Sequence, residues 1–316
     1  MRSMRTSFYL AMVVVLAGCA GTPTRNHSAR APQADAALPA TTATPLDPAS
    51  IRTRLQAGAD VQIASGRISI RRFDFRHNND DVEAVLVHPI GSNAAPGLVL
   101  IPGYSRTAYD LLPIAVRFAR AGFVTLSVSQ PGFGGSTGPA DFAGPRTFSA
   151  VHAAARRFAA EPYVDTARLG VYGYSRGALA AAQLAARTDL FRAAVLGGGI
   201  YDFAAAYRQI SLPGIRANMV QEAGLTKEAV RFRSPIHDAE GFDGPVLIVH
   251  GADDLNAPPD QSRALAERLR KLGRSHELII LPNRAHSLSM EEIVTPAVKF
   301  LQKHLASSNA TAPLSQ

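Results

Sequence analysis

The chain has 316 residues, of which 47% are hydrophobic and 18% are charged, a composition typical of globular proteins. Its formal net charge is +8 at pH 7, but the Lys and Arg residues are spread thinly and form no basic block. These properties exclude a chain that is disordered throughout and give no support for nucleic-acid binding. The single cysteine excludes an internal disulfide and any thiolate metal cluster.

The first element in chain order is a short apolar stretch from Phe8 to Ala17, which follows Arg2 and Arg5. It is too short to cross a bilayer, which takes about 20 residues. Its charged start and small-residue end are the layout of a secretory signal, so we predict a signal peptide over residues 1–18. Reading the cysteine that follows as a small buried hydrophobe fits this flanking pattern poorly.

The end of this signal, Leu16-Ala17-Gly18-Cys19, resembles the lipobox of bacterial lipoproteins. The resemblance implies that Cys19 is lipidated and contacts a lipid bilayer, with several acyl chains giving stable anchoring. It also implies a location in a bacterial cell envelope. Because Ala20 follows the cysteine in place of Asp, the resemblance points to the outer membrane, facing the periplasm.

The segment after Cys19 is rich in Ala, Thr and Pro and has no apolar periodicity, which is typical of a flexible tether. We predict a tether over residues 19–50, a single domain over 51–305 and a disordered tail over 306–316. A domain of this length lies near the upper limit for one hydrophobic core.

The domain opens with an alternating stretch, Arg67 to Arg76, and a second stretch, Val82 to His88, which predict an antiparallel pair. Continuous apolar runs then alternate with amphipathic stretches, as in buried parallel strands joined by helices. The sequence therefore predicts an α/β fold with an eight-stranded, mostly parallel sheet and a small insertion at 202–240, before the seventh strand. The predicted later strands are 98–101, 123–128, 169–172, 193–196, 246–249 and 278–281, and the predicted helices are 108–121, 148–160, 176–187, 261–272 and 290–304.

Two G-x-S-x-G sequences offer a nucleophile, one around Ser136 and one around Ser175. An exposed nucleophilic serine needs a strand that ends in a sharp turn, with a helix beginning at once. Ser175 has this context, because an apolar run precedes it and the helix-forming RGALAAAQLAAR follows. Pro139 follows Ser136 closely and prevents a helix there. We predict Ser175 as the nucleophile and assign Ser136 to a glycine-rich loop that borders the site.

A serine nucleophile needs a base and an orienting acid, expected later in the chain at strand ends. His286 follows a predicted strand and is the predicted base. The acid remains open at this point among Asp254, which we favour, Asp253 and Asp202, all of which follow strands. The aspartates that are not the acid are expected to cap helices or turns.

His250 ends a strand, and we predict that it is packed and hydrogen-bonded rather than a second base. No His or acidic residues show a metal spacing such as H-E-x-x-H, so the sequence predicts neither a metal nor a cofactor.

Two backbone N–H groups are expected to form an oxyanion hole, one after the nucleophile and one in the loop after the third strand. These are the N–H groups of Arg176 and of Tyr104, which lies in Ile101-Pro102-Gly103-Tyr104-Ser105. Gly103 allows the backbone to approach the substrate closely. The Tyr104 ring is expected either beside the acyl pocket or in the core.

The strings PGFGGSTG, VDTARLGVYGYSRGA and SPIHDAEGFDGPVLIVHGADDLNAP, with the His286 segment, resemble α/β hydrolases of the prolyl-oligopeptidase-like and dienelactone-hydrolase-like kind. The resemblance covers residues 82–305. The H-G-x-x-D pattern of that group places the triad acid at Asp254. This chain lacks the H-G-G oxyanion sequence of many members, and its Pro102-Gly103-Tyr104 resembles the P-G-Y of polyester and lipid esterases.

The sequence therefore predicts a membrane-tethered serine hydrolase that uses Ser175, His286 and Asp254 to form an acyl-enzyme. Its expected substrate is a small ester, thioester or short peptide, with esters favoured over peptides. Two alternatives from other classes are a catalytically inactive hydrolase-fold binding module of the envelope and a scaffold whose basic surface contacts anionic lipid.

Overall fold

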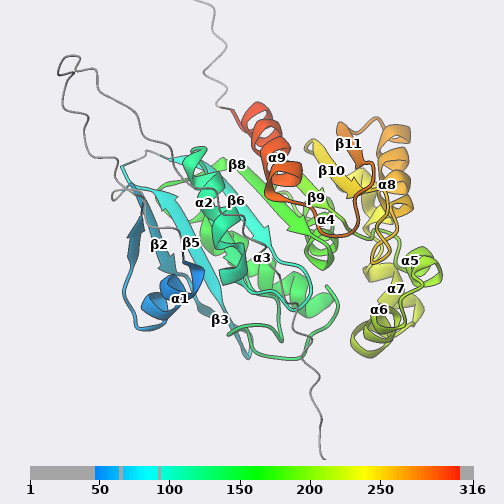
Figure 1. Ribbon diagram of the computed structural model, residues 1–316, viewed down its shortest axis with the longest axis horizontal. Coiled ribbons are helices and arrows are strands. Elements are labelled where there is room, and N and C mark those ends of the chain that lie inside the picture. The colour runs from blue at the N-terminus through cyan, green and yellow to red at the C-terminus, as the bar shows by residue number, and fades with distance from the viewer. Residues whose placement is uncertain (1–46, 64–66, 92–93, 307–316) are drawn as a thin grey trace, which may run out of the picture. The chain divides into compact units, whose positions relative to one another are not determined.

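The computed structural model describes residues 47–63, 67–91 and 94–306 (Figure 1). The predicted signal peptide, Cys19, most of the predicted tether and residues 307–316 of the predicted tail lie outside the described residues. Helix α1, Pro48–Gln56, begins three residues before the predicted domain start. Asp47 caps it by accepting hydrogen bonds from the N–H groups of Ala49 and Ser50.

The centre of the fold is a nine-stranded sheet in the order β1-β2-β5-β7-β6-β8-β9-β10-β11. A separate hairpin is formed by β3 and β4. The sequence predicted eight strands in the main sheet; the ninth is β1, which is too short to show an alternating pattern. The strands are β1 Val61–Ile63, β2 Ile68–Arg72, β3 Phe75–His77, β4 Asp80–Val82, β5 Ala84–Pro89, β6 Ala95–Ile101, β7 Val124–Val128, β8 Val164–Tyr174, β9 Ala193–Gly197, β10 Val246–Gly251 and β11 His276–Leu281.

The sheet is parallel where the predicted site residues lie. Strands β1, β2, β5 and β7 pair antiparallel in turn. From β7 through β6, β8, β9 and β10 to β11, every pairing is parallel. The carboxyl ends of β6, β8, β10 and β11 therefore meet at one edge of the sheet, which confirms the predicted mostly parallel α/β architecture.

Helices cover both faces of the sheet (Figure 1). One face packs with α2 and α9 in an apolar cluster that contains Leu112, Phe118 and Phe300. The other packs with α3, α4 and α8 in a cluster that contains Val151, Leu179 and Leu265. The Ala-rich α4 is buried at every position except Arg187, so it lies against the sheet centre. These helices are η1 Ala108–Leu111 leading into α2 Leu112–Arg120, α3 Pro145–Ala159, α4 Arg176–Arg187, α8 Asp260–Lys271 and α9 Met290–His304.

The segment between β9 and β10 forms the small insertion that the sequence predicted before the seventh strand. Its helices are α5 Phe203–Gln209, α6 Pro213–Asn218, the π-helix η2 Met219–Ala223, α7 Lys227–Phe232 and the 3-10 segment η3 Pro235–Gly241. Each is too short to produce a clear helical period in the sequence. Among the residues that the structure describes, no helix has the length and apolar character needed to cross a membrane.

Candidate active site

Ser175 lies at a sharp turn between β8 and α4. Its φ is +56°, which non-glycine residues rarely adopt. Gly173 and Gly177 make this turn possible, because a Cβ on Gly173 would lie 2.1 Å from the Gly177 carbonyl oxygen. A Cβ on Gly177 would lie 2.1 Å from the carbonyl oxygen of Ile101 in β6. The two glycines therefore let α4 begin directly against the strand ends.

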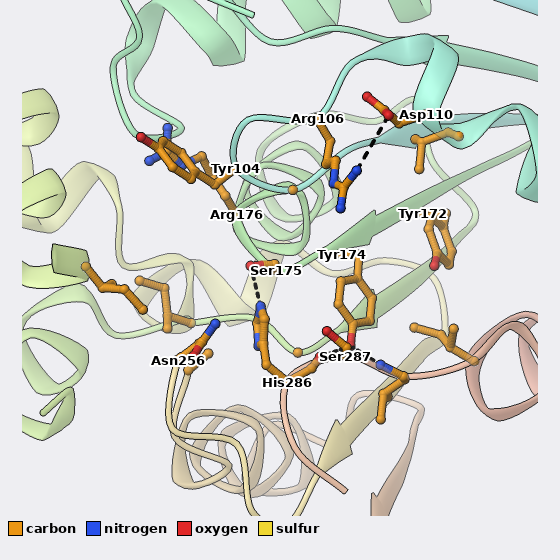
Figure 2. A pocket seen from close by; sticks show the side chains of 18 of the residues that line it. Tyr104, Arg106, Asp110, Tyr172, Tyr174, Ser175, Arg176, Asn256, His286 and Ser287 are labelled. Carbon is orange, nitrogen blue, oxygen red and sulfur yellow. Dashed lines mark hydrogen bonds and ion pairs between the residues drawn. The ribbon is translucent and has the colours of Figure 1, made fainter. Parts of the chain in front are cut away.

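The structure brings Ser175, His286 and Asp254 into one hydrogen-bonded chain. His286 Nε2 lies 2.9 Å from Ser175 Oγ. On the other side of the ring, His286 Nδ1 lies 2.7 Å from Asp254 Oδ2. Figure 2 shows His286 directed at Ser175. A hydroxyl, an imidazole and a buried carboxylate in this order can perform nucleophilic catalysis with proton transfer.

The Asp254 carboxylate is held by four donors. Its Oδ1 accepts hydrogen bonds from the backbone N–H groups of Asn256 (2.8 Å) and Ala257 (2.9 Å). Its Oδ2 faces both His286 Nδ1 and, at 3.1 Å, His250 Nε2. Burial alone would raise the pKa of this carboxyl, but the hydrogen bonds from His250 and His286 outweigh burial and hold the pKa well below its usual range. The carboxylate therefore stays ionised beside His286.

His250 is a fully buried donor to this carboxylate. Its Nε2 faces two acceptors, Asp254 Oδ2 and, at 2.7 Å, the Ala257 carbonyl oxygen. Two acceptors require a proton on Nε2, and Nδ1 on the other side of the ring lies 2.6 Å from the Ser262 hydroxyl. As the sequence predicted, His250 is packed and hydrogen-bonded, but its contact with Asp254 was not foreseen.

The other sequence candidates lie elsewhere. Asp253 is exposed, and Asp202 caps α5 by accepting a hydrogen bond from the Ala205 N–H. Ser136 is buried, accepts from the Glu83 N–H at 2.9 Å and donates to the Ser129 carbonyl at 2.8 Å. Ser136 therefore fastens the glycine-rich loop to Glu83, between β4 and β5, and to Ser129, and no described histidine hydrogen-bonds its hydroxyl.

The loop after β6 lies beside the Ser175 turn. A Cβ on Gly103 would lie 3.3 Å from Ser175 Cβ, so this loop passes close to the serine. The Tyr104 ring is 46% exposed and lines the cavity, which places it at the pocket rather than in the core. Arg176 is the first residue of α4, where the N–H has no partner within the helix.

The Arg176 side chain ties the insertion to this loop. Its guanidinium lies between the rings of Tyr104 and Phe142, 4.4 and 4.3 Å from their centroids. It also forms two hydrogen bonds to Glu222 of η2, at 2.6 and 3.3 Å. Burial lowers the pKa of the guanidinium, and Glu222 opposes that change. No sequence pattern indicates this pair, because Glu222 lies in a segment without clear periodicity.

The segment that carries His286 is fixed at both ends. The Tyr174 hydroxyl donates to the His286 carbonyl oxygen and accepts from the Leu288 N–H at 3.2 Å. The Asp253 N–H donates to the Arg284 carbonyl at 2.8 Å. Tyr174 stands between the glycine and serine of the G-x-S-x-G motif, where its contact with His286 could not be read from sequence.

A cavity of about 490 Å³ lies over Ser175 and has mostly apolar walls. In Figure 2, Tyr172 and Tyr174 lie on one side of the Ser175–His286 pair and Asn256 lies on the other. One wall belongs to the apolar cluster of α2 and α9, and we call it the α2–α9 slot: Leu111, Ile114, Leu288, Met290, Ile293 and Val294. The insertion supplies another part of the lining, with Ile210, Ile215 and Asn218.

Charged groups in the cavity lining are already paired. Arg106 and Asp110 lie 3.6 Å apart, and Arg176 is bound to Glu222. Within the described part of the chain, no group of three or more His, Cys, Asp or Glu residues has the arrangement of a metal site. The cavity is therefore suited to a neutral substrate.

Comparison with protein families gives a match to the prolyl oligopeptidase family over residues 141–308, just over half of the chain. The uncharacterized peptidase YtmA of Bacillus subtilis (strain 168) is 27% identical over 205 residues, which cover 62% of this chain and 77% of that protein. Esterase YjfP of Escherichia coli (strain K12) is 25% identical over 244 residues, covering 71% and 96%. A further match, to the uncharacterized peptidase YuxL of Bacillus subtilis (strain 168), spans only 20% of that protein.

Among solved structures, acetyl xylan esterase 1 from Thermoanaerobacterium sp. JW/SL YS485 matches with a TM-score of 0.67 at 17% identity, covering 84% of this chain and 96% of that one. The Pyrococcus horikoshii acylaminoacyl peptidase matches with a TM-score of 0.66 at 22% identity, covering 77% of this chain and 42% of that one. These structures confirm the α/β-hydrolase fold.

Proposed function

Because the chain belongs to the prolyl oligopeptidase family and is a serine hydrolase of the esterase or peptidase type, we propose that Ser175, His286 and Asp254 are its catalytic triad. The observation that carries this proposal is the continuous chain of contacts, 2.9 Å from Ser175 to His286 and 2.7 Å from His286 to Asp254. The complete set of partners also argues against an inactive binding module.

In the proposed reaction, Ser175 Oγ attacks the carbonyl carbon of the substrate while its proton passes to His286 Nε2. Asp254 stabilises the imidazolium that forms. The negative oxygen of the tetrahedral intermediate accepts hydrogen bonds from the N–H groups of Tyr104 and Arg176. Each such donor typically contributes about 3 to 4 kcal/mol to stabilisation of the transition state.

The intermediate then collapses, and the leaving alcohol takes the proton from His286. This step leaves an ester between the acyl group and Ser175. A water molecule attacks that ester and gives a proton to His286. Release of the carboxylic acid returns the proton to Ser175 and regenerates the site without a cofactor.

We propose an ester as the preferred substrate, in place of a peptide with a free amino terminus. Such a peptide brings a cation that a carboxylate in the cavity would have to balance. In the described lining, the carboxylate of Asp110 is paired with Arg106 and also accepts hydrogen bonds from the Thr107 N–H and hydroxyl. The mostly apolar walls favour a neutral acyl group.

Matched p-nitrophenyl esters and p-nitroanilides with the same acyl group test this choice on the full chain. We expect a higher kcat/KM for each ester after correction for its uncatalysed rate, and no turnover above background by Ser175→Ala. Faster cleavage of aminoacyl anilides than of the corresponding esters would instead make the protein a peptidase.

We also propose that lipidated Cys19 anchors the protein in the cell envelope, on the outer membrane facing the periplasm. The motif Leu16-Ala17-Gly18-Cys19 and the charged apolar start of the chain support this proposal. In a bacterial host, the wild type should fractionate with membranes and carry an N-terminal lipid mass, and Cys19→Ala should lose both. Membrane association that survives Cys19→Ala and disappears in high salt would instead favour the basic scaffold.

A further inference from the structure

The α2–α9 slot is the apolar part of the cavity that α2, α9 and the residues next to them line. Its residues share one cluster with Tyr172 of β8. Arg117 joins α2 to α9, because its guanidinium lies 3.1 Å from Glu291 and donates to the Thr295 hydroxyl at 3.0 Å. No charged side chain belongs to the slot as defined.

Tyr172 brings a polar atom to this apolar surface. Its side chain lines the cavity and is 1% exposed, and its ring packs edge-on against Phe118 at 5.8 Å. Within the described residues, its hydroxyl has no hydrogen-bond partner, whereas the hydroxyl of Tyr174 has two. Burial raises the pKa of the Tyr172 phenol, so it remains a donor at neutral pH.

Tyr172 precedes the reacting serine by three residues, which sets its distance from the reacting centre. Tyr172 and Tyr174 are two residues apart on β8 and therefore face the same side of the sheet. At about 3.3 Å per residue, Tyr172 lies about 10 Å along the strand from Ser175. A substrate group that extends from Ser175 into the slot would reach an apolar wall first and a hydroxyl at greater depth.

We propose that the α2–α9 slot binds an apolar chain of the substrate that carries one uncharged oxygen acceptor, and that this oxygen accepts a hydrogen bond from the Tyr172 hydroxyl. This inference rests on the proposed esterase function and narrows its substrate class to neutral esters with an oxygenated chain. The Tyr172 hydroxyl is not among the fully enclosed side-chain atoms that lack a partner, so it is open to the cavity, where such a ligand supplies an acceptor on an otherwise apolar wall. The apolar part of this ligand buries its methylene groups against Ile114, Ile293 and Val294.

The test compares p-nitrophenyl octanoate with its keto analogues, in which the keto group is moved one carbon at a time along the acyl chain. A second series consists of alkyl acetates that carry the keto group in the alcohol part. The two series together test whether the slot binds the acyl part or the alcohol part of the ester. The full-length proteins are the wild type, Tyr172→Phe and the control Tyr109→Phe. Tyr109 is also a buried tyrosine, but it does not line the cavity.

We expect the wild type to prefer one keto position over the plain ester by about threefold to tenfold in kcat/KM, the range given by one neutral hydrogen bond. Tyr172→Phe should lose this preference and unfold at the same or a higher temperature. Tyr109→Phe should keep the preference. A second variant, Ile114→Phe, puts a larger side chain into the slot. This variant should prefer esters with a shorter apolar chain than the wild type prefers.

The inference is overturned if no keto position is preferred in either series, or if Tyr172→Phe keeps the preference of the wild type. It is also overturned if Ile114→Phe leaves the chain-length preference unchanged. A wild type that hydrolyses none of these esters and is not labelled by a fluorophosphonate would refute the proposed function itself, and the inference with it.

Discussion

Replacing His250 tests how the buried carboxylate is held. His250→Phe keeps a flat ring in the fully buried site but removes the Nε2–H that faces Asp254 Oδ2 at 3.1 Å and the Ala257 carbonyl at 2.7 Å. It also leaves the Ser262 hydroxyl without its hydrogen-bond partner on the ring. The Asp254 Oδ2 atom then keeps a single donor, His286, and the carboxylate loses one of the contacts that fix its plane.

The size of the effect follows from the type of bond. A hydrogen bond to a charged group contributes about 1.5 to 3 kcal/mol. Each 1.36 kcal/mol of transition-state stabilisation changes the rate about tenfold. If the carboxylate orientation matters as the imidazolium forms, His250→Phe should lower kcat by about 10- to 100-fold with little change in KM.

Steady-state kinetics on a p-nitrophenyl ester, with thermal unfolding of each variant, measure this effect. His250→Gln is the matched control, because its amide nitrogen can donate from nearly the same position as Nε2, and it should recover most of the lost kcat. The reasoning is refuted if folded His250→Phe has the kcat of the wild type, or if His250→Gln and His250→Phe are equally slow.

Three further predictions concern neighbouring contacts. Tyr174→Phe removes the hydroxyl that holds the His286 segment, so kcat should fall by about threefold to tenfold with KM nearly unchanged, and an unchanged kcat would show that the segment needs no such contact. The lowered pKa of Asp254 means that the unfolded state binds more protons below about pH 4, so stability from this group is present above about pH 4 and is lost as the pH falls further. The difference between the unfolding midpoints of wild type and Asp254→Asn should therefore be constant from about pH 6 to about pH 4 and narrow steadily as the pH is lowered further; a difference that does not change below about pH 4 would contradict this assignment. Glu222→Ala leaves the buried Arg176 without its ion-pair partner, and urea unfolding should show a loss of about 3 to 5 kcal/mol; a loss under about 1 kcal/mol would mean that the two aromatic rings suffice.

Most of the central sheet could be predicted from sequence because its parallel strands are buried on both faces and appear as continuous apolar runs, as in Val246–Gly251. The predicted bounds of α4 and α9 agree with the structure, since both have a regular helical pattern and clear ends. Strand β1 was missed because three residues are too few for a period. The insertion could be located but not divided into helices for the same reason.

The site could be predicted where its residues follow strands. Ser175 and His286 each follow a parallel strand, and the carboxyl ends of such strands meet at one edge of the sheet. The Arg176–Glu222 pair joins residues 46 positions apart, and no local pattern encodes the path of the chain between them. The contact between His250 and Asp254 depends on side-chain direction within a turn, which residue spacing does not determine.

Labelling of the full-length protein with a fluorophosphonate probe tests the central claim most directly, because the probe reacts with an activated serine. The comparison needs the wild type, Ser175→Ala and Ser136→Ala, the last carrying the same substitution in the second G-x-S-x-G sequence. We predict that the wild type and Ser136→Ala are labelled on Ser175 and that Ser175→Ala is not. An unlabelled but folded wild type, or undiminished labelling of Ser175→Ala, would contradict the proposed mechanism.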